Sequence, residues 1–316
     1  MSCYGLYNAL NSHKRFERSF LGVKMKFNAN SELQGIFLIL LASLSVAILP
    51  NSAKFAFSDG VGMMTLLFAR GLIGIVLLTF LVVITRSSFF LPKALIMLSI
   101  ITGLLALTMI GTLYLAIIYI DVSLSILIVC LYPLVIAIIS HFRRLEFVNI
   151  KQWSCIGFVL LGLCLLIFNG GAKISIIGVS LSIFAMISAV IVTFCSVRLI
   201  NSIGPITTTF YLNFWGLIFL LILLPFLNEN AFPQSKLGWA AMAVNGVFHI
   251  GAWAFFFAGM QRIGATRASM LTSIDPVFAA IIAFLLFNQF FSPVQWFGFF
   301  LVILAIFSFE YFKQKN

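Results

Sequence analysis

An aspartate inside an apolar stretch is the residue whose position most strongly indicates a function. Asp275 lies near the middle of residues 264–287, which are mostly apolar. A carboxyl group at membrane depth is costly unless it is paired or hydrated, so such a residue is a functional candidate by default. Asp275 could bind a cationic group or a coupling proton, or form a structural pair with a neighbouring helix. Pro276 lacks a backbone N–H, which frees nearby carbonyl groups to line a cavity.

A second charged candidate is Arg70, which lies within the apolar residues 61–84. Its guanidinium group could bind an anionic group, pair with Asp275, or serve a structural or gating role. An internal repeat, described below, places Asn213 at the equivalent position, so both halves keep a polar group there.

Three further candidates recur at four-residue spacing, which places Asn245, His249 and Trp253 on one helix face. The indole of Trp253 could stack on a flat ligand, and His249 could form a hydrogen bond or take up a proton. Alternatively, His249 simply bonds to a neighbouring helix. Four hydroxyl-bearing residues complete the candidate set: Tyr114, Tyr132, Tyr211 and Ser188.

Motifs for other kinds of chemistry do not occur. The five cysteines have no CxxC spacing, and the three histidines form no HExxH pair, so we expect neither a metal site nor a cofactor. The sequence contains no GxxxxGK[ST] loop for ATP and no clustered histidines, cysteines or paired carboxylates for acid–base catalysis. These observations argue against an enzyme.

The elements that carry these residues are predicted to be transmembrane helices. Hydrophobic residues make up 62% of the 316-residue chain and charged residues 9%, and the mean hydropathy is +1.16. A helix needs about 20 apolar residues to cross a bilayer. Windows of that length predict ten spans, and helices are the only option because these runs are too long for barrel strands. The spans cover residues 33–51, 61–84, 94–117, 122–141, 153–169, 176–199, 205–227, 237–259, 264–287 and 293–312.

The basic residues predict the orientation of these spans. The net charge is +11, but the basic residues lie in short gaps between apolar runs, so we expect no nucleic-acid partner. Of the 19 Lys and Arg residues, 15 lie in the tails and even-numbered connections, and 3 lie in the odd-numbered ones. The positive-inside rule therefore places both termini in the cytoplasm. The first residues, about 30 in number, are polar and basic and do not resemble a signal peptide. Met25 would serve equally well as a start, in which case residues 1–24 are an upstream extension.

An internal repeat divides the chain into two halves. A shift of 143 residues places Pro133 on Pro276, and also aligns Gln152-Trp153 with Gln295-Trp296. Each half contains five predicted spans, so the second half must cross the membrane in the opposite direction. This is the inverted repeat of many secondary transporters, although duplication could also simply have produced a large stable bundle. We expect a tail at 1–32, repeats at 33–173 and 176–312, and a tail at 313–316.

Two stretches resemble the EamA-type branch of the drug/metabolite transporter superfamily. Residues Tyr114–Pro133 and Phe257–Pro276 are both similar to its pattern of an aromatic-x-Ala helix end, a small-residue turn and a helix with a mid-span proline. Leu67-Phe68-Ala69-Arg70 resembles the arginine of the family's second helix. The resemblance covers residues 33–312 and implies ten helices in two five-helix repeats. It also implies transport of an amino acid, a nucleotide-like metabolite or another small organic solute.

The combined expectation is an all-α integral membrane protein that moves a small organic solute by alternating access. A bacterial inner membrane is the expected location, and the expected partners are the solute and the lipid bilayer, with the chain a monomer or a homodimer. A membrane-embedded lipid-modifying enzyme and a channel are the alternatives.

Overall fold

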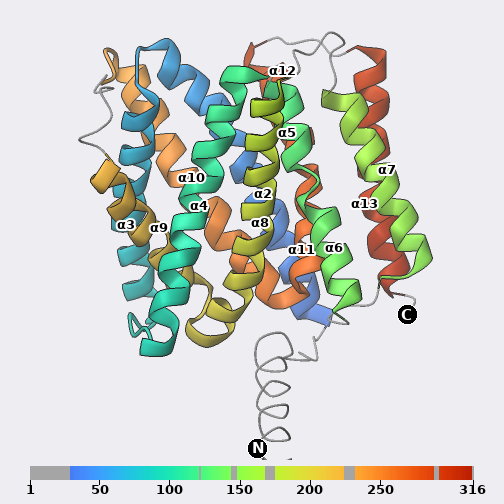
Figure 1. Ribbon diagram of the computed structural model, residues 1–316, viewed down its shortest axis with the longest axis horizontal. Helices are drawn as coiled ribbons and strands as arrows, with labels where there is room; N and C mark the ends of the chain where they lie inside the picture. Colours follow the sequence, from blue (N-terminus) through green and yellow to red (C-terminus); the bar gives the residue numbers. More distant parts are fainter. Residues whose placement is uncertain are drawn as a thin grey trace, which may run out of the picture.

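A computed structural model describes residues 29–120, 122–143, 148–167, 175–223, 232–287 and 292–314. Within these ranges the chain forms helices and no strands (Figure 1). The elements are α2 (Ala29–Ser58), α3 (Met63–Ile84), α4 (Lys93–Tyr119), α5 (Val122–Val129), α6 (Tyr132–Phe142), α7 (Ile150–Ile167), α8 (Ile176–Ile203), α9 (Pro205–Leu223), α10 (Lys236–Ile263), α11 (Ala265–Leu271), the 3-10 helix η2 (Thr272–Ile274), α12 (Asp275–Phe287) and α13 (Pro293–Gln314). The expected all-α class is therefore confirmed.

Seven of the described helices are long and apolar enough to cross a membrane: α2, α3, α4, α8, α9, α10 and α13. Many large apolar side chains on the outside of the bundle are exposed, such as Val76, Ile118 and Phe307 at 68%, 72% and 71%. A water-soluble protein would not leave so much apolar surface uncovered, and lipid is the solvent in which this surface is stable. The count of ten spans stays a prediction.

Two of the expected spans are interrupted, each shortly before a proline. Residues 122–141 form α5 and α6, which are separated at Cys130 and Leu131, and Pro133 lies in the first turn of α6. Residues 264–287 form α11, η2 and α12, and Pro276 is the second residue of α12. Proline favours the first turn because the N–H groups there have no helical partner. The two interruptions are equivalent under the shift of 143 residues.

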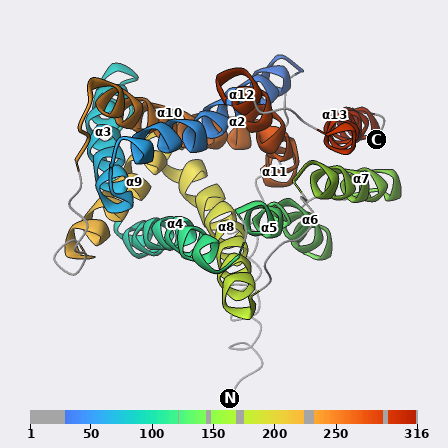
Figure 2. The ribbon, with the colours of Figure 1, turned by 90° about the horizontal axis from the view of Figure 1, so that it is seen from above.

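The helix pairs of one half have equivalents in the other half (Figure 2). In the first pairing, α2 packs along α10, and its equivalent is α8 along α4. Likewise, α3 packs on α10 as α9 packs on α4. The remaining pairings, α3 with α9 and α7 with α13, each join a helix to its own repeat equivalent. This pattern is that of two similar halves related by an approximate two-fold axis.

Individual contacts repeat as well. A Cβ added at Gly35 of α2 would lie 2.5 Å from Ile263, and one at Gly178 of α8 would lie 2.6 Å from Ile120. Gly178 is the repeat equivalent of Gly35, and Ile263 that of Ile120. Two residues before Ile263, Gln261 of α10 donates a hydrogen bond to the carbonyl oxygen of Ile200, near the end of α8, at 3.4 Å. The end of α8 therefore lies near the start of α2, so the two equivalent helices are antiparallel.

One end of the bundle is joined by a buried ionic cluster. Arg267, 2% exposed, donates from Nε to Glu310 at 2.6 and 2.9 Å, and from Nη1 to Glu32 at 3.0 Å. These residues belong to the start of α11, the end of α13 and the first turn of α2. The first and last described helices therefore begin and end on the same side of the molecule, at the bottom of Figure 1.

At the opposite end of the bundle, a carboxylate after α2 binds the start of α10. Asp59, which follows α2, accepts hydrogen bonds from the backbone N–H groups of Gln234 and Ser235, each at 2.9 Å. These bonds, led by that from Ser235, hold the pKa of Asp59 below its usual value. Ser235 also caps α10, because its hydroxyl accepts from the N–H of Gly238 at 3.2 Å.

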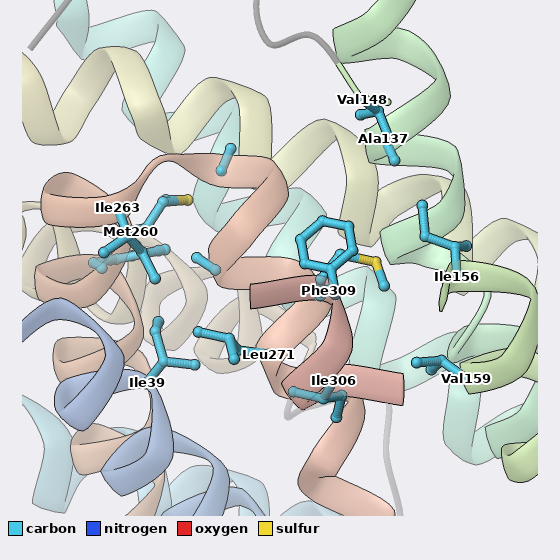
Figure 3. Packing of buried hydrophobic residues seen from close by; sticks show 14 of the residues in the cluster. Ile39, Ala137, Val148, Ile156, Val159, Met260, Ile263, Leu271, Ile306 and Phe309 are labelled. Atoms are coloured by element: carbon cyan, nitrogen blue, oxygen red, sulfur yellow. The ribbon is translucent and has the colours of Figure 1, made fainter. Parts of the chain in front are cut away.

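The main apolar core lies between helices from both halves of the chain (Figure 3). Side chains from α2, α10, α11, α13 and α7 meet there, and the labelled members include Ile39, Met260, Ile263, Leu271, Ile306, Phe309, Ile156 and Val159. This packing joins α7 and α13 to the helices that carry the polar residues.

Candidate functional site: a cavity between the two halves

A cavity of about 60 Å³ lies between α3 and α4 of the first half and α9 and α10 of the second. Most of its lining is aliphatic or aromatic, and its residues with polar side-chain atoms are Arg70, Thr209, Asn213, His249 and Trp253. A water molecule needs about 10–15 Å³ of such space, so the cavity has room for only a few waters.

Arg70 contributes the charge of this cavity. The buried positions of α3 recur every three or four residues, and Arg70 lies on this inward stripe between Leu67 and Gly74. Its exposed fraction is 7%. Its guanidinium lies within electrostatic range of Tyr114 and His249. In the part of the chain that the structure describes, it has no ion pair, and no acidic residue lines the cavity.

Asn213 of α9 lines the same cavity as Arg70, its repeat equivalent. Its side-chain Nδ2 donates to the carbonyl oxygen of Gly71 at 3.0 Å, which ties α9 to α3. A Cβ at Gly74 would lie 2.7 Å from that nitrogen, so the amide fits only because position 74 is glycine. The sequence-based candidate set omitted Asn213 and Thr209. The repeat register was the signal that could have added Asn213.

The polar stripe of α10 divides between two roles. His249, 9% exposed, and Trp253 line the cavity. Asn245, one turn earlier, instead donates from Nδ2 to the carbonyl oxygen of Leu49 at 2.9 Å and to the hydroxyl of Ser52 at 3.0 Å. Asn245 therefore joins α10 to α2 and does not line the cavity.

A second polar centre lies where the two interrupted spans meet. Tyr132 at the start of α6 is hydrogen-bonded to Thr272 of η2, and Tyr132 is the repeat equivalent of Asp275. The hydroxyl of Ser43 on α2 lies beside the Asp275 carboxyl. Oδ1 of Asp275 is buried and has no hydrogen-bond partner among the described residues. Arg70 and Asp275 form no ion pair, and Asp275 does not line the cavity that contains Arg70.

Comparisons with known proteins agree with this architecture. The model of the EamA-like transporter family matches residues 33–168 and 176–309. The chain belongs to this family. Its match in two copies covers both halves, and together with the apolar helices it establishes an integral membrane protein.

A curated relative of this EamA chain is an uncharacterized transporter of Synechocystis sp. (strain ATCC 27184 / PCC 6803 / Kazusa). The two are 24% identical over 208 residues, which is 64% of this chain and 62% of the relative. The matched stretch thus spans less than two thirds of that transporter. A solved crystal structure, 16% identical, aligns with a TM-score of 0.73 over 88% of this chain and 97% of its own, and it shows a shared fold.

The remaining candidate residues do not line the cavity of this EamA protein. The hydroxyl of Tyr211 donates to the carbonyl oxygen of Phe89 at 2.6 Å, at the connection between α3 and α4. Ser188 is buried in α8 at 1% exposure and does not line the cavity. Tyr114 lies near Arg70 without being part of the lining. Of the nine candidates, the structure brings Arg70, His249 and Trp253 into the cavity.

Proposed function

We propose that this chain is a secondary transporter that moves a small organic solute across a bacterial inner membrane by alternating access. The observation that carries the proposal is a mostly apolar cavity that contains a buried arginine and lies between two antiparallel, similarly packed halves. Two such halves can exchange conformations, so that states open to either side have comparable free energies. A cavity for only a few waters fits a closed state in such a cycle.

The proposal includes the organisation expected from the sequence. Residues 33–173 and 176–312 form two five-helix repeats, ten helices span the membrane, and residues 1–32 and 313–316 are cytoplasmic tails. Asp275, which lies outside the cavity beside the interrupted helices, is assigned to the coupling proton. No specific observation favours a channel or a lipid-modifying enzyme over a carrier.

The test is counterflow in proteoliposomes. Purified protein is first screened for thermal stabilisation by amino acids, nucleosides, nucleotides and monocarboxylates, and a stabilising solute is then radiolabelled. A carrier takes up the labelled solute in a saturable manner, and excess unlabelled solute inside the vesicles accelerates the uptake. Protein-free liposomes are the control. Flux that rises linearly with concentration and ignores the internal solute would instead identify a channel, and conversion of vesicle lipids an enzyme.

A further inference from the structure

We propose that the cavity binds a compact organic monoanion with an apolar body, and that Arg70 holds the anionic group. This inference names the solute class of the proposed transporter and therefore rests on that function. Its basis is a buried charge without a partner beside a mostly apolar lining.

The charge balance of the cavity is the first argument. Arg70 is buried to nine-tenths, and the described residues provide it with no ion pair and no hydrogen bond. A guanidinium cannot lose its proton at physiological pH, so its charge persists in the membrane interior. A buried charge is costly unless it is paired. A bound anion supplies the missing partner.

The geometry of the donors is the second argument. A guanidinium presents a planar fork of N–H groups that matches a carboxylate in a bidentate manner. Asn213 and His249 add polar groups to the same lining, whereas the hydroxyl of Thr209 donates to the carbonyl oxygen of Pro205 in its own helix at 2.9 Å. The hydrogen bond from Asn213 to the carbonyl oxygen of Gly71 occupies one amide hydrogen, so the second remains for a ligand. These groups together form a site for one negatively charged, oxygen-bearing group.

The rest of the lining selects against a second charge. It has no carboxylate that could bind an ammonium group, and Asp275 belongs to the separate centre. An amine therefore has no counter-charge here, and neither does the amino group of a zwitterionic amino acid. A phosphate group carries about −1.5 to −2 charges at pH 7, more than a single arginine balances. The single negative charge of a carboxylate balances the single positive charge of Arg70.

Apolar residues specify the body of the solute. Leu67, Leu107, Ile110 and Leu212 line the cavity together with the ring of Trp253, which lies 5.3 Å from the ring of Phe257. Aliphatic and aromatic walls favour an apolar, flat body over a sugar or another polyhydroxylated solute.

The experiment compares molecules that share a phenyl ring and carry different polar or charged groups. Full-length protein in detergent is titrated with 3-phenylpropionate, 3-phenylpropanamide, 3-phenylpropylamine, phenylalanine and phenylphosphonate, and the shift in unfolding temperature gives each affinity. We expect the largest shift with 3-phenylpropionate and a smaller one with phenylphosphonate. Arg70→Gln should weaken 3-phenylpropionate roughly 10- to 100-fold, the effect of losing a hydrogen-bonded charge. Arg70→Lys should fall between the two proteins.

Arg262→Gln is the matched control, because Arg262 donates to the carbonyl oxygen of Ala258 in its own helix and lies outside the cavity. Should Arg70→Gln fail to fold, the ranking of the five compounds on the wild-type protein decides alone. Equal or larger shifts with the amide, the amine or phenylalanine would overturn the inference, as would no shift with either anion. Anion binding without counterflow would contradict the transport function and leave the anion site intact.

Discussion

Asp275 and Arg70 are the two charged side chains that the sequence places at membrane depth, and the structure gives them different surroundings. Arg70 faces a cavity, whereas Asp275 starts α12 beside Tyr132 and Ser43. The depth of both residues could be predicted because hydropathy alone locates a charge within a span. Their separation could not be predicted, because it depends on which helices touch.

At this scale we predict the effect of Asp275→Asn. An amide cannot carry a proton in exchange, so transport should lose its dependence on the pH gradient while the solute still binds in the cavity. Uptake into proteoliposomes with and without an imposed pH gradient measures this effect. Asp59→Asn, which changes a carboxylate outside the spans, should keep the gradient dependence. An unchanged response in Asp275→Asn would exclude Asp275 as the coupling group.

The sequence indicates where helices are interrupted, but it does not indicate which helices contact each other. The breaks before Pro133 and Pro276 follow from a local property, the missing N–H of proline. The pairing of α2 with α10 joins residues that are far apart in the chain, and hydropathy is the same for every apolar face. Glycine explains the closeness of this pairing, because α2 and α10 approach each other at Gly35 and Gly259.

We therefore predict that Gly259→Ala destabilises the protein. The added methyl group would lie 2.6 Å from Cδ1 of Ile39 and 3.0 Å from the carbonyl oxygen of Gly35. Overpacking of this kind costs about 1–3 kcal/mol, which thermal unfolding in detergent can measure. In Gly157→Ala the methyl group meets nothing within 4 Å, so its stability should be equal or up to about 1 kcal/mol higher because alanine favours a helix. Similar unfolding temperatures for the two variants would contradict the close contact.

On the scale of the whole molecule, the internal repeat was predicted from matches of polar residues, glycines and prolines. The same shift of 143 residues also superimposes contacts of one half on contacts of the other. Gly35 with Ile263 and Gly178 with Ile120 are the clearest example. The sequence alone could not locate the cavity, because its lining combines α3 and α4 with α9 and α10. The side of the membrane that each end faces depends on the distribution of Lys and Arg, and it stays a prediction.

Two equivalent lysines provide the test of orientation. Lys93 begins α4 and Lys236 begins α10, both are exposed, and they lie at opposite ends of the bundle. In a cysteine-free background, we expect Lys236→Cys to react with a membrane-impermeant maleimide in intact bacterial cells. Lys93→Cys should react only after the cells are permeabilised. The reverse labelling would place both termini outside, and labelling of both residues in intact cells would contradict a membrane-spanning bundle.

The two ends of the bundle are held together by different chemical groups. The Arg267 cluster keeps its positive charge, because a guanidinium stays protonated at any physiological pH. At the other end, Asp59 has a lowered pKa, and its bonds to the start of α10 contribute stability above the usual aspartate pKa. That contribution is lost as the pH falls through the lowered value. One end of the molecule is thus held by an ion pair whose cation does not titrate, and the other end by a carboxylate that keeps its charge into more acidic solution than an ordinary aspartate does.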